Sequence, residues 1–153
     1  MLTAGIDSYI SVAEADEYIR THYMSTDVSA VRWAALIEAE KEIQLRNACR
    51  LIEALPLSGS CAKDQPLSFP RSSQQAVPPA VKAAQAELAL WLSDTAARSD
   101  DRERQSLVAG GVSSISMGSL SMSLNGVNAV GALACPAAAA LLREFVNGGF
   151  DTE

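Results

Sequence analysis

Apolar residues recur at helical spacing in several stretches of the chain, with polar residues between them. The first stretch begins after Ser11, and Glu14 follows at the spacing of a capping box, in which each side chain bonds the backbone N–H of the other residue. This pattern predicts a helix over residues 12–24. Ser29 can cap a second helical stretch over residues 30–37. The N-terminal part of the chain is therefore predicted to be helical.

A third apolar repeat covers residues 38–55, with acidic side chains in its first turns and arginines later, as the helix dipole favours. The sequence leaves open whether residues 30–55 form one bent helix or two. Residues 56–79 are rich in proline and serine and show no period, which predicts an ordered loop.

The second half of the chain changes from the helical period to the strand period. Pro78 and Pro79 suit the first turn of a helix, which is predicted over residues 80–98. Beyond a charged connector, apolar residues alternate with serines on both sides of Gly118–Ser119, a pattern typical of strands. A hairpin that turns there and a longer strand paired elsewhere both fit this pattern.

A last helix is predicted to begin at Pro136, with Leu141, Leu142 and Phe145 as its apolar stripe and Gly148–Gly149 at its end. The fold class is predicted to be mainly α: a small helical bundle with a β-hairpin or strand extension and a C-terminal helix. The expected regions are a bundle that includes the ordered loop (1–98), a connector with the β extension (99–135), and the C-terminal helix with the tail (136–153).

Composition and charge restrict the classes of function. The chain has 153 residues with 12 basic and 18 acidic side chains, and a net charge of −6 disfavours a protein that works mainly by neutralising phosphates. No apolar run is long enough to span a membrane, and the N-terminus lacks the layout of a signal peptide. We therefore expect a cytosolic protein without a membrane partner. The three cysteines are predicted to be free thiols.

No group of residues in the sequence has the pattern of a catalytic or metal site. His22, the only histidine, has no nucleophile near it in the sequence, and acidic pairs such as Asp16–Glu17 are interpreted as a solvated helix face. A glycine-rich phosphate loop is missing as well. We therefore expect no enzymatic activity, no cofactor and no metal ion.

Nucleic-acid binding needs a cationic surface and aromatic platforms on which bases stack. Residues 1–45 carry 3 basic and 8 acidic side chains, whereas residues 46–90 carry 5 and 3. Both tryptophans lie at apolar helical positions, so packing in the core is their better use. The candidate platforms are Tyr9, Tyr18, Tyr23, Trp33 and Trp91.

Apolar residues outside the main helices exceed what a monomer would leave exposed, notably in residues 107–112, 115–124 and 127–140. This surplus predicts self-association, with strands added between subunits. The candidate interface residues are Arg71, Leu107, Val108, Ile115, Met117, Leu120, Met122, Leu124, Leu141 and Phe145.

Four pieces of sequence resemble, in this order, the small head–tail connector (adaptor) proteins of tailed double-stranded DNA phages, some of which carry the label DnaT-like. They are SYISVAEAD at 8–16, WAAL at 33–36 with EKE at 40–42, QPLSFPR at 65–71, and VPPAVKAAQAELA at 77–89. The resemblance implies a structural protein of the virion neck, made in the host cytoplasm. It also implies a ring of about twelve copies between the portal protein and a stopper or tail-completion protein, through which DNA passes without specific binding.

In such a ring, Arg71 would either pair with a carboxylate or contact a neighbouring subunit. The alternative from another class is a single-stranded DNA-binding replication accessory protein, as the DnaT-like label indicates. That alternative predicts salt-dependent binding of an oligonucleotide, lost when Trp33 or Trp91 is changed.

Overall fold

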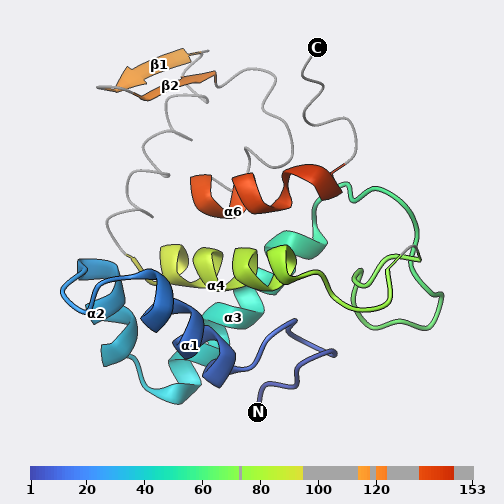
Figure 1. Ribbon diagram of the computed structural model, residues 1–153, viewed down its shortest axis with the longest axis horizontal. Coiled ribbons are helices and arrows are strands. Elements are labelled where there is room, and N and C mark those ends of the chain that lie inside the picture. Colours follow the sequence, from blue (N-terminus) through green and yellow to red (C-terminus); the bar gives the residue numbers. More distant parts are fainter. Residues whose placement is uncertain (73, 95–113, 118–119, 124–134, 147–153) are drawn as a thin grey trace.

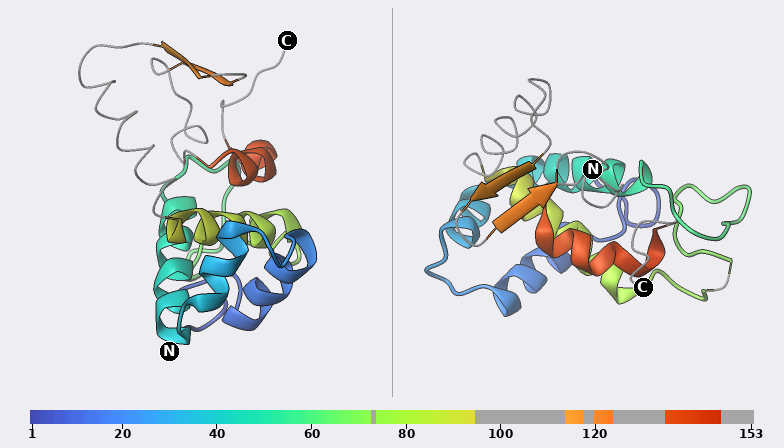
Figure 2. Two further views of the ribbon diagram at one scale, coloured as in Figure 1. Left: turned by 90° about the vertical axis from the view of Figure 1, so that its left-hand side faces the viewer. Right: turned by 90° about the horizontal axis from the view of Figure 1, so that it is seen from above.

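The computed structural model describes residues 1–72, 74–94, 114–117, 120–123 and 135–146. This part of the chain is mainly helical, which confirms the predicted fold class. The elements are, in chain order, α1 (Val12–His22), α2 (Val28–Ala35), α3 (Glu38–Glu53), α4 (Pro79–Ser93), β1 (Ser114–Met117), β2 (Leu120–Ser123), α6 (Pro136–Leu142) and a 3-10 turn (Arg143–Phe145). Helix α4 lies in the middle, with α1, α2 and α3 on one side and α6 on the other (Figure 1 and Figure 2).

The capping box predicted at the start of α1 is present. The Ser11 hydroxyl accepts from the backbone N–H of Glu14 at 3.2 Å, and the Glu14 carboxylate accepts from the N–H of Ser11 at 2.7 Å. The bond from the backbone N–H of Ser11 to this carboxylate, helped by the nearby Lys82 ammonium, lowers the pKa of Glu14. The helix buries Ala15 and Ile19 against the core and ends at His22, two residues before the predicted end.

Residues 30–55 form two helices, which settles the alternative that the sequence left open. Leu36 and Ile37 have extended backbones, so the chain turns between α2 and α3. The predicted cap of α2 is wrong by two residues: Asp27 is the N-cap, and its carboxylate accepts from the N–H groups of Ser29 and Ala30. An aspartate is as good a cap as a serine, and the pattern of apolar residues could not distinguish them.

Helix α4 is buried on nearly every side along its middle. Pro78 and Pro79 stand at its start as predicted, and every residue from Ala84 to Leu90 is buried. A helix packed on two sides has little face left for water, so most of these residues are apolar, and the buried Gln85 and Glu87 are hydrogen-bonded. The helix ends at Ser93 and the backbone of Asp94 is extended, so the helix is shorter than predicted; residues 95–98 lie outside the residues that the structure describes.

The loop after α3 is held to the bundle by Glu53. Its carboxylate accepts from the N–H of Ser68 at 3.1 Å, from the Ser68 hydroxyl at 2.9 Å, and from the Tyr9 hydroxyl. Phe69 is 2% exposed and packs edge-on against both Tyr9 and Phe145. The described part of this loop is therefore ordered, as the sequence predicted.

Strands β1 and β2 pair antiparallel, with Ile115 opposite Met122 and Met117 opposite Leu120. This pairing confirms strands on both sides of the expected hairpin, whose turn residues lie outside the described part of the chain. Helix α6 begins at Pro136 as predicted and buries Leu142 against α4. The end predicted for this helix, at Gly148–Gly149, is wrong: the α-helix ends at Leu142, a 3-10 turn carries Phe145, and the backbone of Val146 is extended.

Candidate nucleic-acid interface

A groove of about 450 Å³ lies between α1 and α2 and reaches Lys41 on α3. Much of its apolar surface is open to solvent, because Met24 is 76% exposed and Val31 is 53% exposed. We call it the α1–α2 groove; its lining residues are Asp16, Ile19, Arg20, Tyr23, Met24, Ser25, Ala30, Val31, Trp33, Ala34 and Lys41. The α1–α2 groove combines aromatic, aliphatic and cationic side chains. Surfaces that bind single-stranded nucleic acids have this combination, because bases stack on aromatic rings and cations contact the phosphates.

One carboxylate in this groove is fixed by two donors from other helices. The indole Nε1 of Trp33 donates to Asp16 Oδ1 at 2.7 Å, and Lys41 Nζ donates to the same oxygen at 2.9 Å. The Lys41 ammonium also lies 5.7 Å from the centroid of the Trp33 ring, within the range of a cation–π contact. The Asp16 side chain is still 44% exposed, in keeping with the solvated face expected for it and for Glu17, but its two donors from other helices were not predicted.

Arg20 is the cation of the α1–α2 groove that is most accessible. Its side chain is 76% exposed and pairs with Glu17, which is 56% exposed. An ion pair between two exposed side chains on one helix contributes little to stability, so the guanidinium can exchange this carboxylate for another anion. Arg32, on α2, is held more firmly, because Nη1 lies 2.6 Å from Asp94 Oδ1 at the end of α4.

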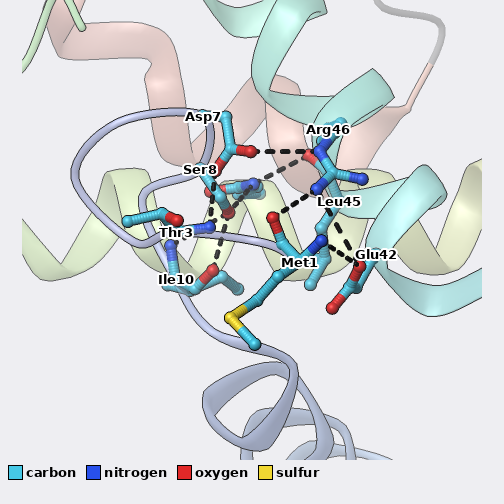
Figure 3. A network of polar contacts seen from close by, with 9 residues as sticks. Met1, Thr3, Asp7, Ser8, Ile10, Glu42, Leu45 and Arg46 are labelled. Atoms are coloured by element: carbon cyan, nitrogen blue, oxygen red, sulfur yellow. Dashed lines mark hydrogen bonds and ion pairs between the residues drawn. The ribbon is translucent and has the colours of Figure 1, made fainter. Parts of the chain in front are cut away.

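Arg46 on α3 binds the N-terminal segment to the bundle (Figure 3). Its guanidinium donates to Asp7 Oδ2 at 3.1 Å and to the carbonyl oxygen of Met1 at 2.7 Å. The backbone N–H of Thr3 and this guanidinium both lower the pKa of Asp7. Arg46 therefore has a structural role. Arg50 and Lys63 are exposed and have no ion pair with any residue that the structure describes.

Most of the aromatic side chains considered for base stacking pack in the hydrophobic core. Trp33 is 2% exposed and Tyr9 is 3% exposed, and Trp91 packs partly buried against the core. The prediction that the tryptophans serve packing is confirmed for Trp33. A substitution at Trp33 would therefore report on folding before it reports on nucleic-acid binding. Tyr23 is half-buried and presents part of its ring to the α1–α2 groove.

Glu87 on α4 is a buried carboxylate for which the sequence predicts no role. It is 8% exposed and accepts hydrogen bonds from the hydroxyls of Tyr18 and Tyr23. Burial, followed by the bond to this carboxylate, raises the pKa of both tyrosines. Glu87 thereby holds Tyr18 of α1 and Tyr23, the residue that follows this helix, against α4. Its only signal in the sequence is a charge within the apolar run of α4.

The predicted interface residues are not brought together in the described part of the chain. The guanidinium of Arg71 donates to the carbonyl oxygens of Ser58, Gly59 and Ser68, and it pairs with no carboxylate among the residues that the structure describes. Its expected contact with a neighbouring subunit stays a prediction. Leu141 and Phe145 pack partly buried against the core. Ile115, Met117, Leu120 and Met122 lie in the two strands, and Leu107, Val108 and Leu124 lie outside the described residues. Their role in an interface stays a prediction.

Other kinds of site find no support in the residues that the structure describes. Among them, no group of three or more histidine, cysteine, aspartate or glutamate side chains is arranged to hold a metal ion, and no helix is long and apolar enough to cross a membrane. The three cysteines are free, as predicted, with Cys49 and Cys135 buried and Cys61 exposed. Burial raises the pKa of the Cys49 thiol to about 12.

Comparison with known families identifies the chain. The family described as "Putative DnaT-like ssDNA binding protein" matches residues 1–152. The chain belongs to this DnaT-like family. Searches of curated proteins and of solved structures gave no match for the DnaT-like chain.

This membership corrects the first interpretation of the sequence. The assignment to phage head–tail adaptors is wrong, because the family that covers the whole chain is one of DnaT-like ssDNA-binding proteins. The predicted partners are wrong for the same reason: a ring of further copies, a portal protein, a stopper or tail-completion protein, and DNA that passes without specific binding. A location at the virion neck and the lack of enzymatic activity stay untested predictions.

Proposed function

We propose that this protein binds single-stranded DNA and that the α1–α2 groove is its contact surface. The observation that carries the proposal is the match of the DnaT-like ssDNA-binding family to residues 1–152. The match supports the class of ligand, and the geometry of the groove supports the place. The alternative function predicted from the sequence is therefore preferred to the adaptor.

The α1–α2 groove offers both kinds of contact that a nucleotide needs. A base lying in it contacts the apolar surface of Tyr23, Met24 and Val31, while the exposed guanidinium of Arg20 at its edge pairs with a phosphate. Arginine binds phosphate through two parallel N–H donors, and base contact with aromatic and aliphatic surface tolerates any sequence. One nucleotide is thus held at its base and at its backbone.

The charge of the chain sets the expected strength of this binding. A net charge of −6 gives little long-range attraction for a polyanion, so affinity depends on the few cations in contact with phosphates. Each such contact contributes about 0.7 to the slope of log K against log salt for a single strand. We therefore expect moderate affinity with a shallow salt dependence.

The test is fluorescence polarisation of a labelled, mixed-sequence single strand, with two matched charge reversals. Arg20→Glu and Arg50→Glu each change the charge by the same amount at an exposed arginine, but only Arg20 lies in the α1–α2 groove. We expect about a tenfold loss of affinity for Arg20→Glu and a much smaller loss for Arg50→Glu. Lack of binding by the unmodified protein would overturn the function, and equal losses in the two variants would overturn the site.

A further inference from the structure

We propose that the α1–α2 groove selects nucleobases that present hydrogen-bond donors, guanine above all, and that Asp16 makes this selection through its second carboxylate oxygen. The inference rests on the proposed function and goes beyond it, because it assigns base preference to a single atom. It starts from the asymmetry of the Asp16 carboxylate.

The two oxygens of this carboxylate have different surroundings. Oδ1 accepts from Trp33 Nε1 at 2.7 Å and from Lys41 Nζ at 2.9 Å, which uses both of its lone pairs. Oδ2 has no hydrogen-bond partner among the residues that the structure describes, and the Asp16 side chain is 44% exposed. A donor group on a ligand in the groove can therefore reach Oδ2 without displacing any protein contact.

The donors on Oδ1 also fix the direction of the carboxylate before a ligand arrives. Trp33 is 2% exposed and the side chain of Lys41 is 14% exposed, so neither donor moves freely. A preorganised acceptor loses little conformational entropy when it forms its bond, and more of the bond energy remains for discrimination.

The chemistry of the bases decides which of them gains from this acceptor. Guanine presents N1–H and the N2 amino group side by side, so both can donate to one oxygen that has two lone pairs. Cytosine and adenine each present one amino group beside a ring nitrogen acceptor. Thymine has its single N3–H between two carbonyl oxygens, which a carboxylate repels. The expected order is guanine first, then cytosine and adenine, then thymine.

The experiment compares three labelled single strands by fluorescence polarisation: an oligothymidylate, the same strand with isolated guanines, and that strand with inosine in place of each guanine. Inosine keeps the ring system of guanine and lacks only the N2 amino group, so this pair separates hydrogen bonding from stacking. We expect the guanine strand to bind about tenfold more tightly than oligothymidylate, with the inosine strand in between.

A variant tests whether Asp16 causes the preference. Asp16→Asn places an N–H donor where Oδ2 stood, so the ratio of guanine to thymine affinity should fall to about one or below. The control, Glu17→Gln, removes the same charge from the adjacent exposed position and should leave the ratio unchanged. A circular dichroism spectrum confirms that each variant is folded, and the inosine comparison needs no variant at all.

The outcomes separate this inference from the function on which it rests. If no strand binds, the proposed function fails. If all strands bind with equal affinity, or if guanine and inosine strands bind equally, single-stranded DNA binding stands and selection by Asp16 is overturned. A preference for guanine that survives in a folded Asp16→Asn variant overturns it as well.

Discussion

Two polar clusters of this protein involve helix α1 and the segment before it, and they differ in how completely they are bonded. Beside α4, the buried Gln85 accepts from the N–H of Tyr9 at 2.9 Å and donates to Ser8 Oγ at 2.7 Å and to the carbonyl oxygen of Leu45 at 2.8 Å. In the α1–α2 groove, Asp16 has one fully bonded oxygen and one open oxygen. We call the Gln85 cluster closed, because its polar atoms have protein partners, and the Asp16 cluster open, because Oδ2 has none among the described residues. A closed cluster specifies structure, whereas an open cluster at the surface is available to a ligand.

The largest expected effect comes from breaking the closed cluster. Gln85→Leu leaves the buried N–H of Tyr9 without its acceptor, at a cost of about 1–3 kcal/mol, and it also removes the hydrogen bonds to Ser8 Oγ and to the Leu45 carbonyl, each contributing about 1 kcal/mol. We expect the free energy of unfolding to fall by about 4 kcal/mol in urea denaturation. The same substitution at the exposed Gln75 should change it by no more than about 0.5 kcal/mol. Similar values for both variants would show that the Gln85 contacts do not hold the core.

A smaller effect is expected where one bond of the open cluster is removed. Trp33→Phe keeps an aromatic ring in the core but loses the Nε1 donor to Asp16 and part of the buried volume of the indole, so the free energy of unfolding should fall by about 2–3 kcal/mol. Thermal or urea unfolding measures this loss. An unchanged midpoint would mean that the bond from Trp33 does not help to hold Asp16. It would contradict the statement that two donors fix the direction of this carboxylate.

At the N-terminus of α2, removal of the cap is expected to lower the free energy of unfolding by about 1 kcal/mol. Asp27→Ala removes the carboxylate that accepts from two backbone N–H groups, which typically costs about 1 kcal/mol at an N-cap. Ser29→Ala removes only a hydroxyl that bonds Asp94 at 3.1 Å, and we expect less than half of that loss. Urea denaturation of both variants decides between them, and a larger loss for Ser29→Ala would restore the cap predicted from the sequence.

The smallest effect concerns pH and the capping box of α1. The pKa of Glu14 in the folded protein lies below its ordinary value of 4.5, so its carboxylate contributes stability above pH 4.5 that is lost as the pH falls through the lowered pKa. Below pH 4.5, the free energy of unfolding should therefore decrease more steeply for the unmodified protein than for Glu14→Gln. Denaturant titrations at several acidic pH values measure the two slopes, and parallel slopes would contradict the assignment.

The comparison of the clusters also shows what the sequence could predict. The capping box, the prolines of α4 and α6 and the periodic apolar faces are local signals, and each led to an element that the structure contains. The open carboxylate is not a local signal, because the donors to Asp16 come from α2 and α3. The position of Asp16 next to Glu17 in the sequence indicated only two exposed acidic side chains.

Arg71 and Glu87 are two further residues whose partners the sequence could not predict. Arg71 was expected to meet a carboxylate or a neighbouring subunit, yet it donates to three backbone carbonyls of its own loop. Glu87 lies in an apolar run and gains its two tyrosine donors only when α1 packs on α4. Partners that are distant in sequence are set by the packing of helices, which the period of apolar residues does not encode.

The most direct test of the central claim is an ¹⁵N-resolved NMR titration of the protein with unlabelled single-stranded DNA. We predict that the backbone amides of Arg20, Tyr23, Met24, Val31 and Ala34, which line the α1–α2 groove, shift with a common affinity. The amides around Arg50 and Lys63, exposed cations outside the groove, should stay in place. Shifts confined to those two cations, or no shift at any amide, would contradict the account.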